Sequence, residues 1–256
     1  MLTFDLLPGL SRKIHAELYA CGFTCLDDIV ACSPDDLRRV KGIKSTAEAI
    51  HAHARAYVAG APQWLAPMPA HVIDAPCAYL DIETNPMAGN TVWSITVSAE
   101  EMPPLSILVC DGLNPLTKPY HDRVIVTYSA EEAWQAALDS VPAGAPILHW
   151  TGFDSGVMRQ TAGEPARSLL DARMVDLHAL VKHAIAFPLR SRSLKVVAPY
   201  VGFQWRAYDR WDLALMDFQR WVLNGDRASF MQMLAYIQDD VDAMSVVMAW
   251  LRANRA

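Results

Sequence analysis

The pattern of apolar and polar positions changes near residue 77. Beyond it, short runs alternate between apolar and polar residues, as half-buried β-strands do. We expect strands at residues 78–83, 91–97, 105–110, 124–128 and 146–150, and a helix at 130–138. After residue 154 the spacing becomes mainly helical, up to a long amphipathic stretch from Phe230 to Leu251. Strands followed by strands alternating with helices predict an α/β domain whose mixed sheet is flanked by helices.

Residues 1–60 show short helical stretches separated by glycine and predict a small all-α domain. Leu7-Pro8-Gly9-Leu10 is echoed by Val40-Lys41-Gly42-Ile43, and a helical pattern follows each. Ser33-Pro34-Asp35-Asp36 is a typical helix start, with a serine cap, a proline at the first helical position and acids in the first turn. Residues 61–76 hold four prolines, which disfavour both helix and central strand. We therefore expect a Pro-rich linker at 61–76 and a second domain at 77–256.

Composition and charge narrow the class of protein. The 256 residues are 52% hydrophobic and 20% charged, which is typical of a globular protein with a buried core. No apolar run approaches the ~18 residues of a membrane span, and the start of the chain lacks a signal-peptide pattern, so we expect a cytoplasmic protein without membrane contact. The net charge of −6 argues against bulk electrostatic coating of nucleic acid, although carboxylates that bind divalent cations contribute to it.

Five cysteines form an odd, scattered set, which is not the framework of a secreted disulfide-rich protein. Cys21, Cys25 and Cys32 lie close together in the sequence. A zinc or iron–sulfur site needs paired short spacings and a fourth ligand, and none is evident nearby. We therefore favour buried free thiols over a metal site.

The residues best suited to chemistry are acids at the ends of predicted elements. Asp81 and Glu83 lie two apart on a strand, so both side chains point to one face, at the end where α/β sheets bind ligands. Asp154 follows the strand that ends at residue 150, and Tyr236 and Asp240 share one face of the last helix. Each motif alone has a simpler interpretation. Asp81 and Glu83 could be solvated acids at a strand end, and Asp154 could cap the next helix. Tyr236 could pack beneath a solvated Asp240. Together, four carboxylates can hold two divalent ions ~4 Å apart, the spacing used for in-line displacement at phosphorus.

Three motifs then resemble a known family. Leu80-Asp81-Ile82-Glu83-Thr84, His149-Trp150-Thr151-Gly152-Phe153-Asp154 and Tyr236-Ile237-Gln238-Asp239-Asp240-Val241 look like the exonuclease motifs of the DEDD superfamily, tyrosine subtype. From about Tyr79 to Leu251 the chain is similar to the predicted ribonuclease-H-like exonuclease domains of bacteria and archaea. One departure is Ile237, where that family usually has asparagine. Because Asp239 adjoins Asp240, two acids compete for the last metal position, and we choose Asp240 on its spacing from Tyr236.

The resemblance implies a ribonuclease-H-like fold and a 3′–5′ exonuclease that hydrolyses phosphodiester bonds of DNA or RNA. Its cofactors would be two Mg²⁺ or Mn²⁺ ions. The implied catalytic residues are Asp81, Glu83, Asp154, Tyr236 and Asp240, and the four acids among them are the implied metal ligands. In this scheme the tyrosine hydroxyl orients the attacking water.

The repeat near the N-terminus resembles the two hairpins of a helix–hairpin–helix domain, which holds phosphate against backbone N–H groups at a glycine turn. The usual second glycine of each hairpin is Ser11 and Lys44 here, and Lys44 can offset the loss at the second one. A protein-contact module in residues 1–60 is the alternative. A basic cluster near residues 190–195 can also contact a nucleic-acid backbone, although clustered charge is more often solvated surface. The expected nucleic-acid contacts are Gly9, Gly42, Lys44, Arg192, Ser193 and Lys195.

Two functions are consistent with these features. The first is a two-metal exonuclease that removes nucleotides from a 3′ end. The second is a catalytically weak or inactive nuclease-like module that recruits DNA to a repair or defence assembly. Intact acids at the four expected positions favour the enzyme, whereas the altered hairpins and the overall acidity are compatible with the second.

Overall fold

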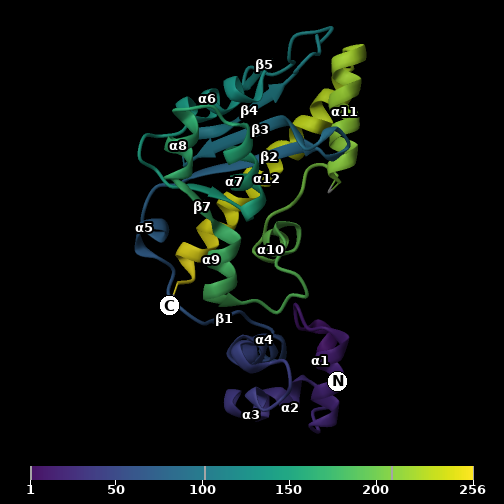
Figure 1. The fold of residues 1–256 in the computed structure, drawn as a ribbon, viewed down its shortest axis with the longest axis vertical. Coiled ribbons are helices and arrows are strands. Elements are labelled where there is room, and N and C mark those ends of the chain that lie inside the picture. The colour runs from purple at the N-terminus through teal and green to yellow at the C-terminus, as the bar shows by residue number, and fades with distance from the viewer. Residues whose placement is uncertain (1, 101, 209, 256) are drawn as a thin grey trace. The chain divides into compact units, whose positions relative to one another are not determined.

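The computed structural model describes residues 2–100, 102–208 and 210–255, and its elements are drawn in Figure 1. Its helices, with η for 3₁₀ turns, are η1 (Phe4–Leu6), α1 (Arg12–Ala20), α2 (Leu26–Ala31), α3 (Pro34–Arg38), η2 (Lys44–Thr46), α4 (Ala47–Ala59), α5 (Ala70–Ile73), η3 (Pro86–Ala88), α6 (Ala130–Ser140), α7 (Gly152–Thr161), α8 (Ala166–Asp171), α9 (Leu177–Ala184), α10 (Leu194–Tyr200), α11 (Trp211–Asn224) and α12 (Arg227–Ala253). Its strands are β1 (Gln63–Trp64), β2 (Ala78–Asn85), β3 (Thr91–Ala99), β4 (Met102–Val109), β5 (Val124–Thr127), β6 (Ile147–His149), β7 (Met174–Asp176) and β8 (Ile185–Ala186).

The chain divides into two compact units. The helical unit contains the described residues up to Met68, together with Ala179–Val197 and Arg255. The sheet unit contains the described residues of Pro69–His178 and Ala198–Asn254.

A six-stranded sheet in the order β5-β4-β3-β2-β6-β7 forms the centre of the sheet unit. The meander β2-β3-β4 is antiparallel, whereas β5, β6 and β7 pair in parallel with their neighbours. One apolar cluster joins the sheet to α6, α7 and α8, and a second joins β3 and β4 to α11 and α12. These observations confirm the predicted α/β fold, with a mixed sheet flanked by helices.

Side-chain alternation along β2 determines where its acids point. Leu80 and Ile82 enter the cluster shared with α6 and α7. Successive side chains of a strand point to opposite faces, so Asp81 and Glu83 lie on the other face, which α12 covers. The apolar pattern of β2 thereby holds two carboxylates against a helix.

The long helix predicted near the C-terminus is present as α12, which has 27 residues. A short turn separates it from α11: Gly225 adopts a left-handed conformation with φ of 66°, and the Asp226 side chain accepts hydrogen bonds from Ala228 and Ser229 N–H groups. Glycine ends a helix at this conformation without steric cost, and aspartate is a favoured N-cap. None of the described helices is long and apolar enough to cross a bilayer.

The helical unit packs Leu18, Leu26, Ile29 and Leu37 into one core. The predicted start at Ser33 is confirmed, because its hydroxyl accepts from the Asp36 N–H group while the Asp36 carboxylate accepts from the Ser33 N–H group. Both repeat glycines adopt positive φ, 80° at Gly9 and 93° at Gly42. Between residue 2 and the first turn, the part of the chain that the structure describes there, the helical element is the three-residue η1.

The compact units differ from the ranges expected from the sequence. Residues 61–76 contain β1 and α5, and β1 pairs antiparallel with β8, far along the chain. Leu65 N–H donates to the Ala184 carbonyl at 2.7 Å, and His53 Nδ1 lies 3.1 Å from the Phe187 carbonyl oxygen. Sequence-distant pairing therefore places residues 179–197 with the N-terminal helices, rather than with the sheet.

Candidate active site

Three carboxylates converge in the sheet unit. Asp81 and Glu83 come from β2, and Asp240 comes from α12. Each offers one oxygen, and these oxygens all lie within 4.8 Å of one another. The Asp240 side chain is buried, and Asp81 and Glu83 are half-buried. Like charges held this close repel, and the repulsion is strong where water is partly excluded.

The donor chemistry of this cluster fits a divalent cation. Carboxylate oxygens are the ligands preferred by hard cations such as Mg²⁺ and Mn²⁺. Across the sheet, Ser94 pairs with Glu83, and the buried Ser94 hydroxyl has no hydrogen-bond partner among the described residues. A buried hydroxyl without a partner is costly, and a hydrated ion beside Glu83 would supply polar contacts at this position.

Tyr236 lies on α12 one turn before Asp240 and is only 4% exposed. Its hydroxyl donates a hydrogen bond to Glu83. Burial raises the pKa of Tyr236, and the charges of Glu83, Asp240 and Asp81 raise it further. The phenol is therefore protonated at neutral pH and acts as a hydrogen-bond donor, not as a base.

The structure separates the roles of the two adjacent acids on α12. Asp239 is fully buried and accepts hydrogen bonds from the backbone N–H and the Nε of Arg206, at 2.7 and 2.5 Å, and from the Ala207 N–H at 3.3 Å. Consecutive helix positions point about 100° apart, and Asp240 instead joins the acidic cluster. Asp239 thus anchors the chain before α11, and Asp240 is the acid available to a cation.

A second tyrosine, which the sequence analysis did not identify, packs against the first. The Tyr208 ring centroid lies 5.6 Å from that of Tyr236, and its hydroxyl donates to Asp217 at 2.9 Å. Asp217 also accepts from Ser229 Oγ at 2.8 Å and from Arg220 Nη1 at 3.1 Å. The signal in the sequence was an aspartate, Asp217, on the face of α11 that is otherwise apolar, because a buried acid needs polar partners.

A family model agrees with this architecture. The model described as the RNase_H superfamily matches residues 78–252, which include every strand of the sheet. The chain belongs to the RNase_H superfamily. A comparison with curated proteins found no match. Membership in the RNase_H superfamily indicates nuclease activity on nucleic acid, and the acidic cluster is consistent with the divalent metals that such nucleases use.

Asp154 holds a different position in this RNase_H domain. It lies in the first turn of α7, where one carboxylate oxygen accepts from the Thr151 N–H group at 3.4 Å in a capping box. The same oxygen lies 3.6 Å from His149 Nδ1. Among the described residues, the cluster within 4.8 Å contains only the other three acids. The helix-cap interpretation of Asp154 is therefore confirmed, and its role as a metal ligand stays a prediction.

The residues predicted to contact nucleic acid all belong to the helical unit. Gly9, Gly42 and Arg192 line one pocket of about 280 Å³, together with Lys182. The Arg192 Nη2 contacts His53 Nε2 at 2.5 Å, so this guanidinium is partly engaged inside the unit. Of the other predicted contacts, Lys44 and Ser193 are exposed and Lys195 is half-buried.

Proposed function

We propose that this protein is a metal-dependent 3′–5′ exonuclease that hydrolyses phosphodiester bonds of nucleic acid by a two-metal mechanism. One observation carries the proposal: Asp81, Glu83 and Asp240 converge beside a buried tyrosine whose hydroxyl is directed at Glu83. This arrangement occurs in a chain of the RNase_H superfamily. The resemblance of its motifs to the tyrosine subtype of DEDD exonucleases supports the 3′–5′ polarity.

The chain's own residues have distinct tasks in this reaction. Asp81, Glu83 and Asp240 would hold Mg²⁺ or Mn²⁺, with Asp154 as the proposed fourth acid. The bound ions would supply Lewis acidity, which lowers the pKa of water and offsets charge at the phosphate. Tyr236 stays protonated and donates its one hydroxyl proton to Glu83, so its oxygen remains free to accept a hydrogen bond from a water in line with the scissile bond. Tyr208 packs against the Tyr236 ring and limits its movement.

In the same proposal, the helical unit contacts the nucleic-acid backbone. Its two glycine turns and two basic side chains, Lys182 and Arg192, line one pocket. Backbone N–H groups at glycine turns and cationic side chains both bind phosphate. The exposed Lys44, at the start of η2, adds a positive charge next to the second turn.

Digestion of 5′-labelled DNA and RNA strands, with Mg²⁺, Mn²⁺ or EDTA, tests this function. We expect a ladder that shortens from the 3′ end, only with metal, and its loss in Asp81→Ala. Asp122→Ala is the matched control, because Asp122 is an exposed acid outside the cluster. Binding without cleavage in either metal would instead support the recruitment module, and internal cuts would contradict the exonuclease assignment.

A further inference from the structure

The pocket of the helical unit, about 280 Å³ in volume, combines apolar walls with a cationic side chain. Its apolar lining includes buried Leu7 and Ile50 and half-buried Leu10 and Ile14, which belong to or pack against one apolar cluster. Arg192, which is half-buried, lines it as well. An apolar cavity of ~150 Å³ holds a benzene ring, so this pocket has room for a ring or chain that carries a polar end.

Among the described residues, Arg192 contacts a neutral side chain, and no acid lines the pocket. Burial, and then the charge of Arg192, lower the pKa of His53 to about 4, so its ring is neutral near neutral pH. His53 Nδ1 lies 3.1 Å from the Phe187 carbonyl oxygen and donates to it, which leaves Nε2 to accept from the Arg192 Nη2 at 2.5 Å.

The guanidinium therefore keeps its full positive charge in a partly dry position. The Arg192 Nε is buried and has no hydrogen-bond partner within the described residues. Burial lowers the pKa of Arg192, as expected for a cation taken out of water without an acid beside it. A cation in such a place is costly unless an anion pairs with it. The pocket is thus suited to a negatively charged ligand.

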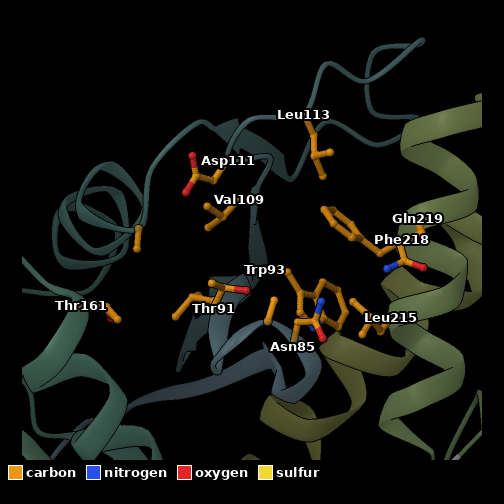
Figure 2. Close-up of a pocket in the computed structure, with 13 residues that line it drawn as sticks. Asn85, Thr91, Trp93, Val109, Asp111, Leu113, Thr161, Leu215, Phe218 and Gln219 are labelled. Carbon is orange, nitrogen blue, oxygen red and sulfur yellow. The ribbon is translucent and has the colours of Figure 1, made fainter.

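Figure 2 shows a pocket of different character in the sheet unit. It has a volume of about 460 Å³, and Asn85, Trp93 and Phe218 are among its lining residues. The charged residue of its described lining is Asp111, which would repel an anion. An apolar anion should therefore select the pocket of the helical unit over this one.

Charge and shape together indicate the class of ligand. A guanidinium binds carboxylates and phosphates through parallel hydrogen bonds. A backbone phosphate, which the proposed function places at this pocket, would pair with Arg192 but would leave the apolar walls uncovered. Lys182, the other cation of the lining, is exposed, so its charge is screened by solvent. One half-buried cation balances a single negative charge, and a carboxylate on an apolar body supplies both that charge and the apolar surface.

We infer that the pocket of the helical unit binds a small organic carboxylate with an apolar ring or chain. The carboxylate accepts from Arg192, including its unpartnered Nε, and the apolar body lies against Leu10 and Ile14. This inference goes beyond the proposed function and does not depend on nuclease activity. Because a backbone phosphate would use the same guanidinium, the carboxylate and nucleic acid compete for it.

Calorimetric titration of the full chain, without metal or nucleic acid, tests the site with naphthoate, its neutral isostere naphthamide and inorganic phosphate. The wild type should bind naphthoate at least about tenfold more tightly than naphthamide, the contribution of a hydrogen bond to a charged group, and more tightly than phosphate. Arg192→Gln should lose the preference for naphthoate over naphthamide. Thr46→Trp, at an exposed position of the lining, should weaken the binding of both.

Arg190→Gln is the matched control and should bind naphthoate as the wild type does, since Arg190 is exposed and does not line the pocket. Equal affinity of the wild type for naphthoate and naphthamide, or for naphthoate and phosphate, would overturn the inference. So would the absence of binding of both naphthoate and octanoate at millimolar concentrations, or an unchanged preference in Arg192→Gln. If thermal melts show that Arg192→Gln is unfolded, Thr46→Trp decides, because undiminished binding by this variant overturns the assignment. A chain that binds naphthoate as expected but cuts no strand would contradict the proposed function alone.

Discussion

Replacing Tyr236 with phenylalanine removes one hydroxyl and keeps the ring. The lost group is the hydrogen-bond donor to Glu83. The ring contact with Tyr208, 5.6 Å between centroids, is retained, as is the surrounding apolar cluster. The substitution therefore tests positioning chemistry with little change in packing.

The magnitudes follow from what the hydroxyl can do. Burial and three neighbouring carboxylates raise the pKa of Tyr236, so the phenol stays protonated. The substitution therefore removes a hydrogen-bond donor and does not remove a general base. Loss of one positioning hydrogen bond in a transition state commonly lowers kcat ~10²–10³-fold. The free energy of unfolding should change by about 1 kcal/mol or less, since Glu83 is half-buried and can be hydrated. The carboxylates remain, so the Mn²⁺ affinity should be nearly unchanged.

Single-turnover digestion of a 5′-labelled strand at saturating Mn²⁺ measures this effect, and calorimetric titration of Mn²⁺ measures cation binding. Tyr128→Phe is the control, because Tyr128 is exposed in the same unit. If Tyr236→Phe turns over within about threefold of the wild type, far from the ~10²-fold loss expected of a positioning group, Tyr236 only packs. The tyrosine-subtype proposal would then be wrong.

Three further predictions concern metal and stability. Mn²⁺ at about 100 times its Kd should raise the free energy of unfolding of the wild type by ~2.7 kcal/mol. Thermal melts of Asp81→Ala should show no such gain. If the wild type is not stabilised either, the proposed metal site is wrong. Asp239→Ala should lower the free energy of unfolding by about 1–3 kcal/mol, because it leaves the backbone N–H groups of residues 206–207 without their acceptor. This variant should still be stabilised by Mn²⁺, whereas Asp240→Ala should not. The reverse result would make Asp239 the metal ligand and Asp240 the structural acid. Burial, and then the charge of Arg192, lower the pKa of His53 from 6.5 to about 4, so the unfolded chain binds this proton first as pH falls. The contribution of neutral His53 to the free energy of unfolding is therefore complete above pH 6.5 and is lost toward pH 4, by ~3 kcal/mol in total. Unfolding curves of His53→Gln, measured across this pH range, should lack this loss. A variant with the same acid dependence as the wild type would contradict the prediction.

Strands and helices of the sheet unit could be predicted from the sequence because their apolar and polar positions are periodic. Alternation predicted β3, which the structure extends to Ala99, and amphipathic spacing predicted α12, which it extends to Arg227 and Ala253. Spacing also placed Asp81 with Glu83, and Tyr236 with Asp240, each pair within a single element. Such short-range relations depend only on the rise and twist of a strand or helix.

Relations between distant residues were harder to predict. The adjacent acids Asp239 and Asp240 are equivalent in the sequence, and only the position of Arg206 beside the helix separates them. The pairing of β1 with β8 is carried by two residues in each strand, too few for a pattern, so the sequence did not indicate that residues 179–197 pack with the N-terminal helices. Tyr208 has no motif of its own, and its proximity to Tyr236 arises from the fold of the chain before α11.

The sequence by itself determined the α/β class, the main strands and the last helix, and it predicted the acids of the proposed chemistry. These follow from periodicity and from the scarcity of carboxylates at apolar strand and helix positions. Only the tertiary structure brought Asp240 to the acids of β2, gave Asp239 a structural partner and formed the pocket beside Asn85. The physical reason is that a convergent site and a cavity depend on how elements pack across long sequence separations, which local propensity does not encode.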